Sequence, residues 1–203
     1  MTMKLYHNPA SPFVRKVAVM LGEAGLGERV QIVPVSGNAV DPGTMPVGLN
    51  PLGKIPALEL ADGRVLYDSR VICRYVDSLA GGRFYPTDAT LWDVLVVEAT
   101  ADGLMEAGVL MTYEGRVRPE AIRFAPWVEG QWAKVARATG ELERRWLPLL
   151  HGGFGAAQIA VAAALGYLDL RHGARNWRQD RPGLTAWEAM IRQRPSIRAT
   201  IPG

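Results

Sequence analysis

The sequence predicts an α/β domain over residues 1–79 followed by an all-helical domain over residues 87–203. In the first part, short β-type runs alternate with helical patterns, which is typical of an α/β layer. A stretch with two glycines and a proline, residues 80–86, then interrupts the chain, and such residues favour turns and linkers. Beyond it, apolar residues recur at helical spacing and no strand pattern returns.

The chain begins with a predicted strand over Met3–His7 and a turn rich in proline and asparagine. Ser11 is a favourable N-cap, and Pro12 suits the first helical position. The helix that follows is expected to end near Gly22 and Gly25. Arg15 and Lys16 are expected on its solvated face, where they would add positive potential near Ser11.

A β-hairpin is predicted over residues 57–67, because Asp62-Gly63 separates two short apolar runs. Pro56 precedes the first strand and has no N–H to give to a sheet. Two interpretations of Pro56 stay open on these grounds. It is either a trans proline at a sheet edge, the commoner state, or a cis proline that leaves the backbone of Ile55 free for a ligand.

The next helix is expected to begin at Ser69 as its N-cap. The free N–H groups at a helix start favour an anion, whereas Asp68 beside them favours a cation. The pair therefore suits a zwitterion such as the end of an amino acid. Simple capping by Ser69 remains the more conservative interpretation.

In the second part, helices are expected over about residues 91–113, from Pro119 to about Trp146, over 156–170, and from Thr185 until Pro195 ends the last one. The third of these begins at Gly155-Ala156-Ala157-Gln158, where Gln158 can serve as half of a capping box.

Composition excludes several classes of protein. A hydrophobic content of 48% and a mean hydropathy of +0.01 describe a globular protein with an ample core. No apolar run approaches the ~18 residues of a membrane span, and no signal peptide is recognisable. A net charge of +3 is too small to indicate nucleic-acid binding.

The cysteine and histidine residues predict a protein of a reducing compartment, and they predict no metal site in the protein. Cys73 is the single cysteine, so no internal disulfide can form, and a cytoplasmic location is expected. It lies among apolar residues of a predicted helix and is interpreted as a structural thiol. The three histidines show no metal-ligand spacing.

Taken in order, five segments resemble the cytosolic-type glutathione transferases of bacteria. They are Leu5–Val17, Asn50–Leu60, Asp68–Asp77, Ile159–Arg171 and Arg194–Pro202. No single segment is specific, but their order and spacing match the family across nearly the whole chain. The resemblance implies a thioredoxin-like N-terminal domain, a helical-bundle C-terminal domain and a cis Pro56.

The resemblance also implies a glutathione site. The backbone of Ile55, before Pro56, would pair with the peptide, and Asp68 with Ser69 would hold the γ-glutamyl end. Arg70 occupies a position that touches the ligand in some classes. Phe13 and Lys54 complete the set of residues that we assign to glutathione binding.

Ser11 is the candidate catalytic residue. It stands where some classes carry a cysteine, and a serine cannot form a mixed disulfide with glutathione. Its hydroxyl can instead donate a hydrogen bond to the glutathione sulfur and favour the thiolate. Ala10 is a departure, because some serine classes place their hydroxyl one residue earlier.

The expected activity is therefore a glutathione transferase acting on an unidentified electrophile, in a homodimer. A non-catalytic binding or regulatory protein on the same fold, or a glutathione-dependent isomerase, are the alternatives. Candidate residues for the electrophile pocket are Gly108, Met111, Tyr113 and Trp177. Each of them is a residue type more often found in a core or on a surface than at a ligand.

Overall fold

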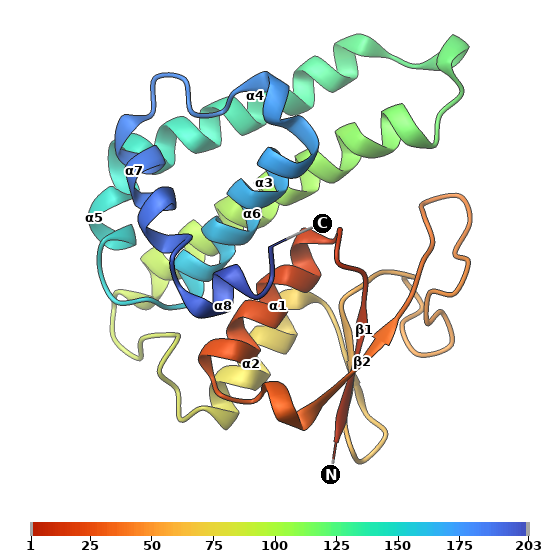
Figure 1. Ribbon diagram of the computed structural model, residues 1–203, viewed down its shortest axis with the longest axis vertical. Coiled ribbons are helices and arrows are strands. Elements are labelled where there is room, and N and C mark those ends of the chain that lie inside the picture. The colour runs from red at the N-terminus through yellow and green to blue at the C-terminus, as the bar shows by residue number, and fades with distance from the viewer. Residues whose placement is uncertain (1, 202–203) are drawn as a thin grey trace.

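The computed structural model describes residues 2–201, and Figure 1 shows a small sheet with two helices below a larger group of helices. The elements of the first part are β1 Met3–His7, α1 Pro12–Glu23, η1 Gly27–Arg29, β2 Val30–Pro34, β3 Ala57–Glu59, β4 Val65–Leu66 and α2 Ser69–Leu79. Those of the second are α3 Leu91–Arg116, η2 Glu120–Ile122, α4 Ala125–Glu141, η3 Leu142–Trp146, α5 Leu147–Leu150, α6 Ala156–His172, η4 Gly173–Arg175, α7 Pro182–Ile191 and α8 Pro195–Arg198.

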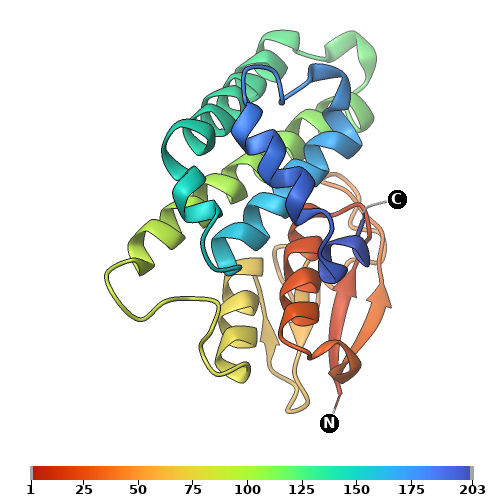
Figure 2. The ribbon, with the colours of Figure 1, turned by 60° about the vertical axis from the view of Figure 1, so that its left-hand side comes forward.

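The sheet has the strand order β2-β1-β3-β4. β1 pairs parallel with β2 and antiparallel with β3, where Tyr6 lies opposite Ala57. β3 and β4 form the expected hairpin, with Leu58 opposite Leu66. Helices α1 and α2 cover the same face of this sheet, as Figure 2 shows. This mixed sheet with its helices confirms the predicted thioredoxin-like α/β class.

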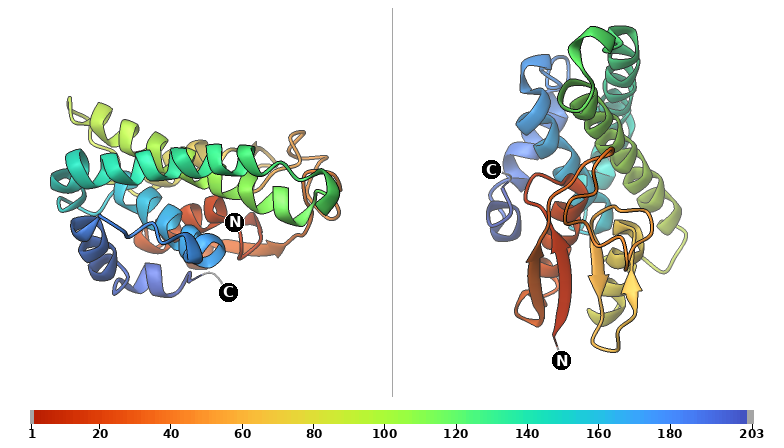
Figure 3. Two further views of the ribbon diagram at one scale, coloured as in Figure 1. Left: turned by 90° about the horizontal axis from the view of Figure 1, so that it is seen from above. Right: turned by 90° about the vertical axis from the view of Figure 1, so that its right-hand side faces the viewer.

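The second part is helical, as predicted. The long helices α3 and α4 run side by side, and α6 packs between α3 on one side and α1 on the other (Figure 3). Helix α6 is alanine-rich and almost wholly buried, so it joins the core of the helical part to that of the α/β part. Within residues 2–201, no helix combines the length and the apolar character needed to cross a membrane.

Several helix boundaries differ from the sequence prediction; α7, expected from Thr185, begins at Pro182, and α3 extends to Arg116. Pro119 precedes a single 3₁₀ turn, and α4 begins only at Ala125, with Pro126 in its first turn. Both prolines suit a helix start, and the chain uses the later one. Pro195 likewise begins the short α8, after α7 has ended at Ile191.

The start of α6 keeps half of a capping box, as expected from Gln158. The backbone N–H of Gly155 donates to Oε1 of Gln158 at 3.1 Å. The amide nitrogen of Gln158 in turn donates to the carbonyl oxygen of Leu149 at 2.7 Å. The side chain thus fixes the helix start against the preceding turn.

The predicted domains include Met1 and residues 202–203, and the segment that resembles the family ends at Pro202. These positions lie outside the residues that the structure describes.

Candidate functional site

Three loops meet at one edge of the sheet. The loop after β1 leads to Ser11, the loop before β3 carries Ile55, and the loop after β4 leads to Asp68. Since β3 runs antiparallel to both β1 and β4, its start lies beside the ends of the other two. Ligands of open α/β sheets bind at such strand ends. The topology therefore gathers the predicted site residues from three distant parts of the sequence.

The turn before α1 holds Ser11 through local hydrogen bonds. The N–H of Ser11 donates to the carbonyl of Asn8 at 3.0 Å, and the side chain of Asn8 donates to the carbonyl of Val35 at 3.1 Å. Oγ of Ser11 accepts a hydrogen bond from the N–H of Val14 at 3.3 Å, so Ser11 is the N-cap, as predicted. This bond uses the oxygen and leaves the hydroxyl proton available to a ligand.

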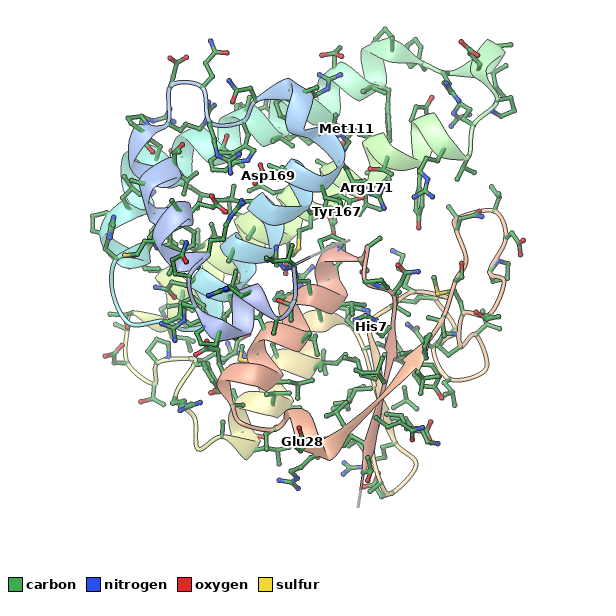
Figure 4. All side chains as sticks on the ribbon, in the orientation of Figure 1. His7, Glu28, Met111, Tyr167, Asp169 and Arg171 are labelled. Atoms are coloured by element: carbon green, nitrogen blue, oxygen red, sulfur yellow. The ribbon has the colours of Figure 1, made fainter. Side chains whose placement is uncertain are left out.

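His7 is not placed as a base for Ser11. Within residues 2–201 no hydrogen bond joins the two side chains, and Oγ of Ser11 instead accepts from the N–H of Val14. His7 is labelled in Figure 4, on β1 below the start of α1. A serine nucleophile needs a base within hydrogen-bond reach. The arrangement fits a serine that donates a hydrogen bond, and it does not fit a serine that is deprotonated for attack.

The bond between Ile55 and Pro56 is cis, which confirms the expectation from the family resemblance. Pro56 is buried, Ile55 is half-buried and Lys54 is exposed. The preceding loop is organised by Asn50, which is 1% exposed. Its side chain donates to the carbonyl of Lys54 at 2.8 Å and accepts from the N–H of Leu52 at 3.1 Å. Asn50 thereby fixes the approach to Ile55.

The start of α2 differs from the prediction by one residue. The N-cap is Asp68, whose Oδ1 accepts from the N–H of Arg70 at 3.0 Å, and Ser69 is the first helical residue. Aspartate and serine are equally good N-caps, so the backbone geometry determines which of the two residues caps α2. Ser69 is 1% exposed, and its hydroxyl makes no hydrogen bond within the described residues. It therefore remains free to bond a ligand at the helix start.

Arg70 links this helix start to the helical part of the molecule. Its Nε lies 3.0 Å from Oδ2 of Asp102 on α3 and 3.7 Å from Oδ2 of Asp68. Asp102 also accepts from Nζ of Lys16 on α1 at 2.9 and 3.1 Å. One buried carboxylate thus holds cations from α1 and α2 together.

The structure contradicts the expectation that Arg15 and Lys16 lie on a solvated face. Arg15 is 7% exposed and Lys16 is fully buried. Lys16 points toward α3, where Glu98 lies 2.8 Å from its Nζ in addition to Asp102. A lysine can be buried at acceptable cost only when it is paired and hydrogen-bonded, and two carboxylates from a helix about 85 residues away in the sequence supply that pairing.

This cluster keeps Lys16 charged. Burial opposes the charged amine, but the neighbouring Cys73, Asp102 and Glu98 outweigh it and raise the pKa of Lys16. Glu98 also accepts from the hydroxyl of Tyr85 at 2.8 Å. We call Lys16, Glu98, Asp102 and Arg70 the α1–α3 ion cluster. Among the described residues, no group of His, Cys, Asp and Glu side chains is arranged to hold a metal ion.

Cys73 borders the ion cluster and is fully buried. Burial raises the pKa of its thiol to about 12. A thiol of that kind is not nucleophilic near neutral pH, because the thiolate is the reactive form. The interpretation of Cys73 as a structural residue agrees with these properties.

Three of the four candidate residues for an electrophile pocket, Gly108, Met111 and Trp177, are buried. Trp177 is buried, and its indole N–H donates to Asp169 at 2.8 Å, so it has a structural role. Met111 is buried on α3 and is labelled in Figure 4 near Tyr167 and Arg171 of α6. Gly108 packs directly under Tyr167, where an added Cβ would come within 3.1 Å of the ring.

Several residues that support the candidate site were not predicted from the sequence. Asn50 carries a weak signal, since asparagine before proline favours turns. Glu98 and Asp102 carry none, because both fall on a helix whose face cannot be assigned without its neighbours. Tyr167 is held by Thr112, whose hydroxyl lies 3.0 Å from the phenol oxygen.

Comparison with known proteins decides the family. The model of the glutathione S-transferase N-terminal domain matches residues 10–79, and the model of the C-terminal domain matches residues 125–189. The GST-like protein YibF of Escherichia coli K12 is 33% identical over 98% of both chains. The chain belongs to the glutathione S-transferase family.

Solved structures of this family superpose closely on the chain. A glutathione transferase family member from Pseudomonas fluorescens Pf-5, solved with bound glutathione, is 46% identical with a TM-score of 0.97 over the whole of both chains. A glutathione S-transferase from Methylobacillus flagellatus KT, solved with glutathione bound, is 37% identical with a TM-score of 0.87, again over the whole of both chains. The fold and the bacterial type of glutathione transferase predicted from the sequence are therefore confirmed.

Proposed function

We propose that this glutathione S-transferase family member binds glutathione at the three-loop edge of its sheet and transfers it to an electrophilic small molecule. The observation that carries the proposal is the convergence there of Ser11, the backbone of Ile55 before a cis proline, and the start of α2. These supply a hydroxyl donor, an extended backbone and a zwitterion site. Glutathione is a tripeptide with a thiol and a zwitterionic end, so its parts correspond to the three loops.

The γ-glutamyl end of glutathione is assigned to the start of α2. The hydroxyl of Ser69 and the free N–H groups of the first turn receive the carboxylate, because helix N-termini favour anions. Asp68, whose side chain is 58% exposed, receives the ammonium group. Arg70 lies against the carboxylate site while Asp102 fixes its position.

The peptide part and the thiol are assigned to the other two loops. The N–H and C=O of Ile55 pair with the cysteinyl backbone, and Lys54 lies exposed beside them. Phe13 lies half-buried in the first turn of α1 next to Ser11. Ser11 donates its hydroxyl proton to the sulfur, and the N-terminus of α1 lowers the thiol pKa below its ordinary value near 8.5.

The reaction then needs only a thiolate held in place. The thiolate attacks an electrophilic carbon and a thioether forms. In a substitution the leaving group departs with its bonding electrons; in an addition the π electrons shift to the neighbouring atom, which takes up a proton from water. A hydrogen bond to the sulfur stabilises the negative charge of the thiolate. Holding the thiolate in place beside the electrophile reduces the entropy that the two reactants lose when they come together. The Pseudomonas relative has also been solved with bound S-(propanoic acid)-glutathione, a thioether of this kind.

Calorimetric titration and turnover of a generic electrophile test the proposal. Wild type is expected to bind glutathione below millimolar concentration. Ser11→Ala is expected to keep binding and lose about a hundredfold in kcat/KM, as for the loss of one charge-stabilising donor. Ser78→Ala is the matched control, because Ser78 is exposed on α2 and bonds only to the carbonyl of Tyr75.

No binding at millimolar glutathione would overturn the proposal. Binding without turnover of any electrophile would favour the non-catalytic alternative. Turnover that Ser11→Ala leaves unchanged would assign thiol activation to another group.

We also propose a homodimer located in the cytoplasm. Helices α2 and α3 each leave large apolar side chains exposed, with Val71 of α2 at 47%, Trp92 of α3 at 69% and Val96 of α3 at 50%. Large exposed apolar side chains are candidates for a protein interface. A second copy is the occupant that the family resemblance favours. The lone cysteine and the use of glutathione both fit a reducing compartment.

A further inference from the structure

A cavity of about 240 Å³ lies between α1, α6, α7 and α8, apart from the glutathione site. None of the residues assigned to glutathione binding lines it. Much of its wall is apolar and comes from Ala162, Leu170, Ile191, Ile197 and Ile201. Three charged side chains besides that of Arg15, those of Asp169, Glu188 and Arg192, complete the lining.

Arg15 brings a buried positive charge to this cavity. Its side chain reaches from α1 to α6, where Nη1 occupies the space that a Cβ at position 166 would need, within 1.8 Å of it. Gly166 is therefore the residue that admits the guanidinium. Arg15 is 7% exposed, and no carboxylate lies within salt-bridge distance of it among the described residues.

The hydrogen bonds of Arg15 are incomplete. Nη1 and Nη2 reach the carbonyls of Ala162 and Ile197 only at 3.4 Å, and Nε has no partner within residues 2–201. Burial, followed by repulsion from Arg192, lowers the pKa of Arg15 to about 10. An arginine that is buried without a paired anion is costly. Guanidinium groups bind carboxylates in a planar, bidentate manner.

The two carboxylates of the cavity are already paired. Asp169 binds Arg178 at 2.5 and 2.7 Å and Arg192 at 2.9 Å. Glu188 binds Arg178 at 3.1 Å and Arg192 at 2.6 Å. With Arg15 included, three guanidinium groups meet two carboxylates among the described residues, which leaves one excess positive charge there.

We propose that this cavity is a second binding site, for a small monocarboxylate with an apolar body. The excess charge at Arg15 receives the carboxylate, and the wall of aliphatic side chains receives the hydrocarbon. A volume of about 240 Å³ has room for several waters, so it suits a medium-chain carboxylate better than a single small ion. An inorganic anion would leave the apolar wall unused, and a neutral ligand would leave Arg15 unpaired.

Calorimetric titration of the full chain with octanoate tests this site. Octanoate is expected to bind with similar affinity in the presence and absence of saturating glutathione, because the two sites share no residue. The alcohol octanol and inorganic phosphate are each expected to bind at least tenfold more weakly. Equal binding of octanol would overturn the role of Arg15, and equal binding of phosphate would overturn the role of the apolar wall.

Two variants place the ligand in the cavity. Arg15→Met removes a charge that has no paired anion among residues 2–201, so the variant should fold and lose octanoate binding at least tenfold. Ile201→Glu puts a carboxylate at a position that is 60% exposed and lines the cavity, so it should repel octanoate without disturbing the core. Ile122→Glu is the matched control, since Ile122 is 61% exposed and lies on η2 outside the lining.

The glutathione measurements separate this site from the proposed transferase function. Both variants are expected to bind glutathione like wild type. Octanoate binding that survives Ile201→Glu, or that Ile122→Glu weakens equally, would overturn the assignment to this cavity even if glutathione still binds. If the wild type does not bind glutathione, the proposed transferase function is overturned. The octanoate result does not depend on that outcome, because the two sites share no residue.

Discussion

Cys73 is expected to be inert in the native protein. Its thiol is fully buried and burial raises its pKa to about 12, so the thiolate is scarce even at about pH 8. Titration with a chromogenic disulfide reagent should give no thiol in native buffer and one equivalent in denaturant. Stoichiometric labelling of the native protein would contradict the buried environment.

Asp102 is expected to matter for both stability and glutathione binding. Asp102→Asn leaves Lys16 buried with half of its pairing, and breaking a buried ion pair costs about 3 kcal/mol. Urea unfolding should measure that loss. Arg70 also loses its partner, so glutathione affinity should fall.

The control for this variant is Glu106→Gln, because Glu106 is exposed on the same helix. A loss below about 1 kcal/mol for Asp102→Asn, no larger than that of the control, would mean that Glu98 alone compensates Lys16.

At the residue scale, the sequence predicts well what depends on near neighbours. Ser11 as a cap and the Asp62-Gly63 turn follow from local chemistry and are present. The choice between Asp68 and Ser69 could not be predicted, since both are good caps and adjacent. The burial of Lys16 could not be predicted either, because its partners lie on a helix far along the chain.

Among elements, the contact between α1 and α8 is expected to depend on pH. Burial acts to raise the pKa of Glu23, but hydrogen bonds from Arg194 and Ser196 outweigh it and hold the pKa below its ordinary value of 4.5. A lowered pKa stabilises the folded state above the unfolded value, and this contribution is lost as pH falls through the folded value.

Thermal unfolding of wild type and Glu23→Gln from about pH 7 to about pH 3 measures this contribution. The wild type should be the more stable near neutral pH, and the difference should vanish at the acidic end. Glu28→Gln, which changes an exposed residue of η1, should follow the wild type throughout. A difference that stays constant with pH would assign the effect of Glu23→Gln to packing.

The elements themselves were largely predictable, because their apolar periodicity is strong. The starts of α4 and α8 were not, since Pro119, Pro126 and Pro195 all satisfy the local rule for a first helical turn. Which proline begins a helix is decided by what the following residues pack against, and that is tertiary information.

At the scale of the whole molecule, Trp92→Glu is expected to convert the proposed dimer to a monomer. A charge placed within an apolar interface is costly, because it is desolvated without a partner. Sedimentation velocity should show the shift. Phe124→Glu is the control, because Phe124 is 60% exposed but lies at the start of α4, away from α2. A wild type that sediments as a monomer would contradict the dimer.

The candidate site illustrates what the whole molecule adds to local sequence patterns. Ser11, Ile55 and Asp68 each stand out locally, yet only the antiparallel pairing of β3 with β1 and β4 brings their loops to one edge. The family resemblance supplied that arrangement in advance. Residues that support the site from the helical part, such as Asp102, needed the three-dimensional structure.

The α1–α3 ion cluster has a consequence for protein engineering. Lys16 belongs to the α/β part, whereas the two carboxylates that pair with it belong to the helical part. Each part alone would therefore contain charged groups without their partners. A chimaera that joins residues 1–79 to the helical part of a relative would leave the buried ammonium group of Lys16 without a partner, unless that relative has acidic residues at the positions of Glu98 and Asp102. Recombination within this family should therefore succeed most often when α1 and α3 are inherited together.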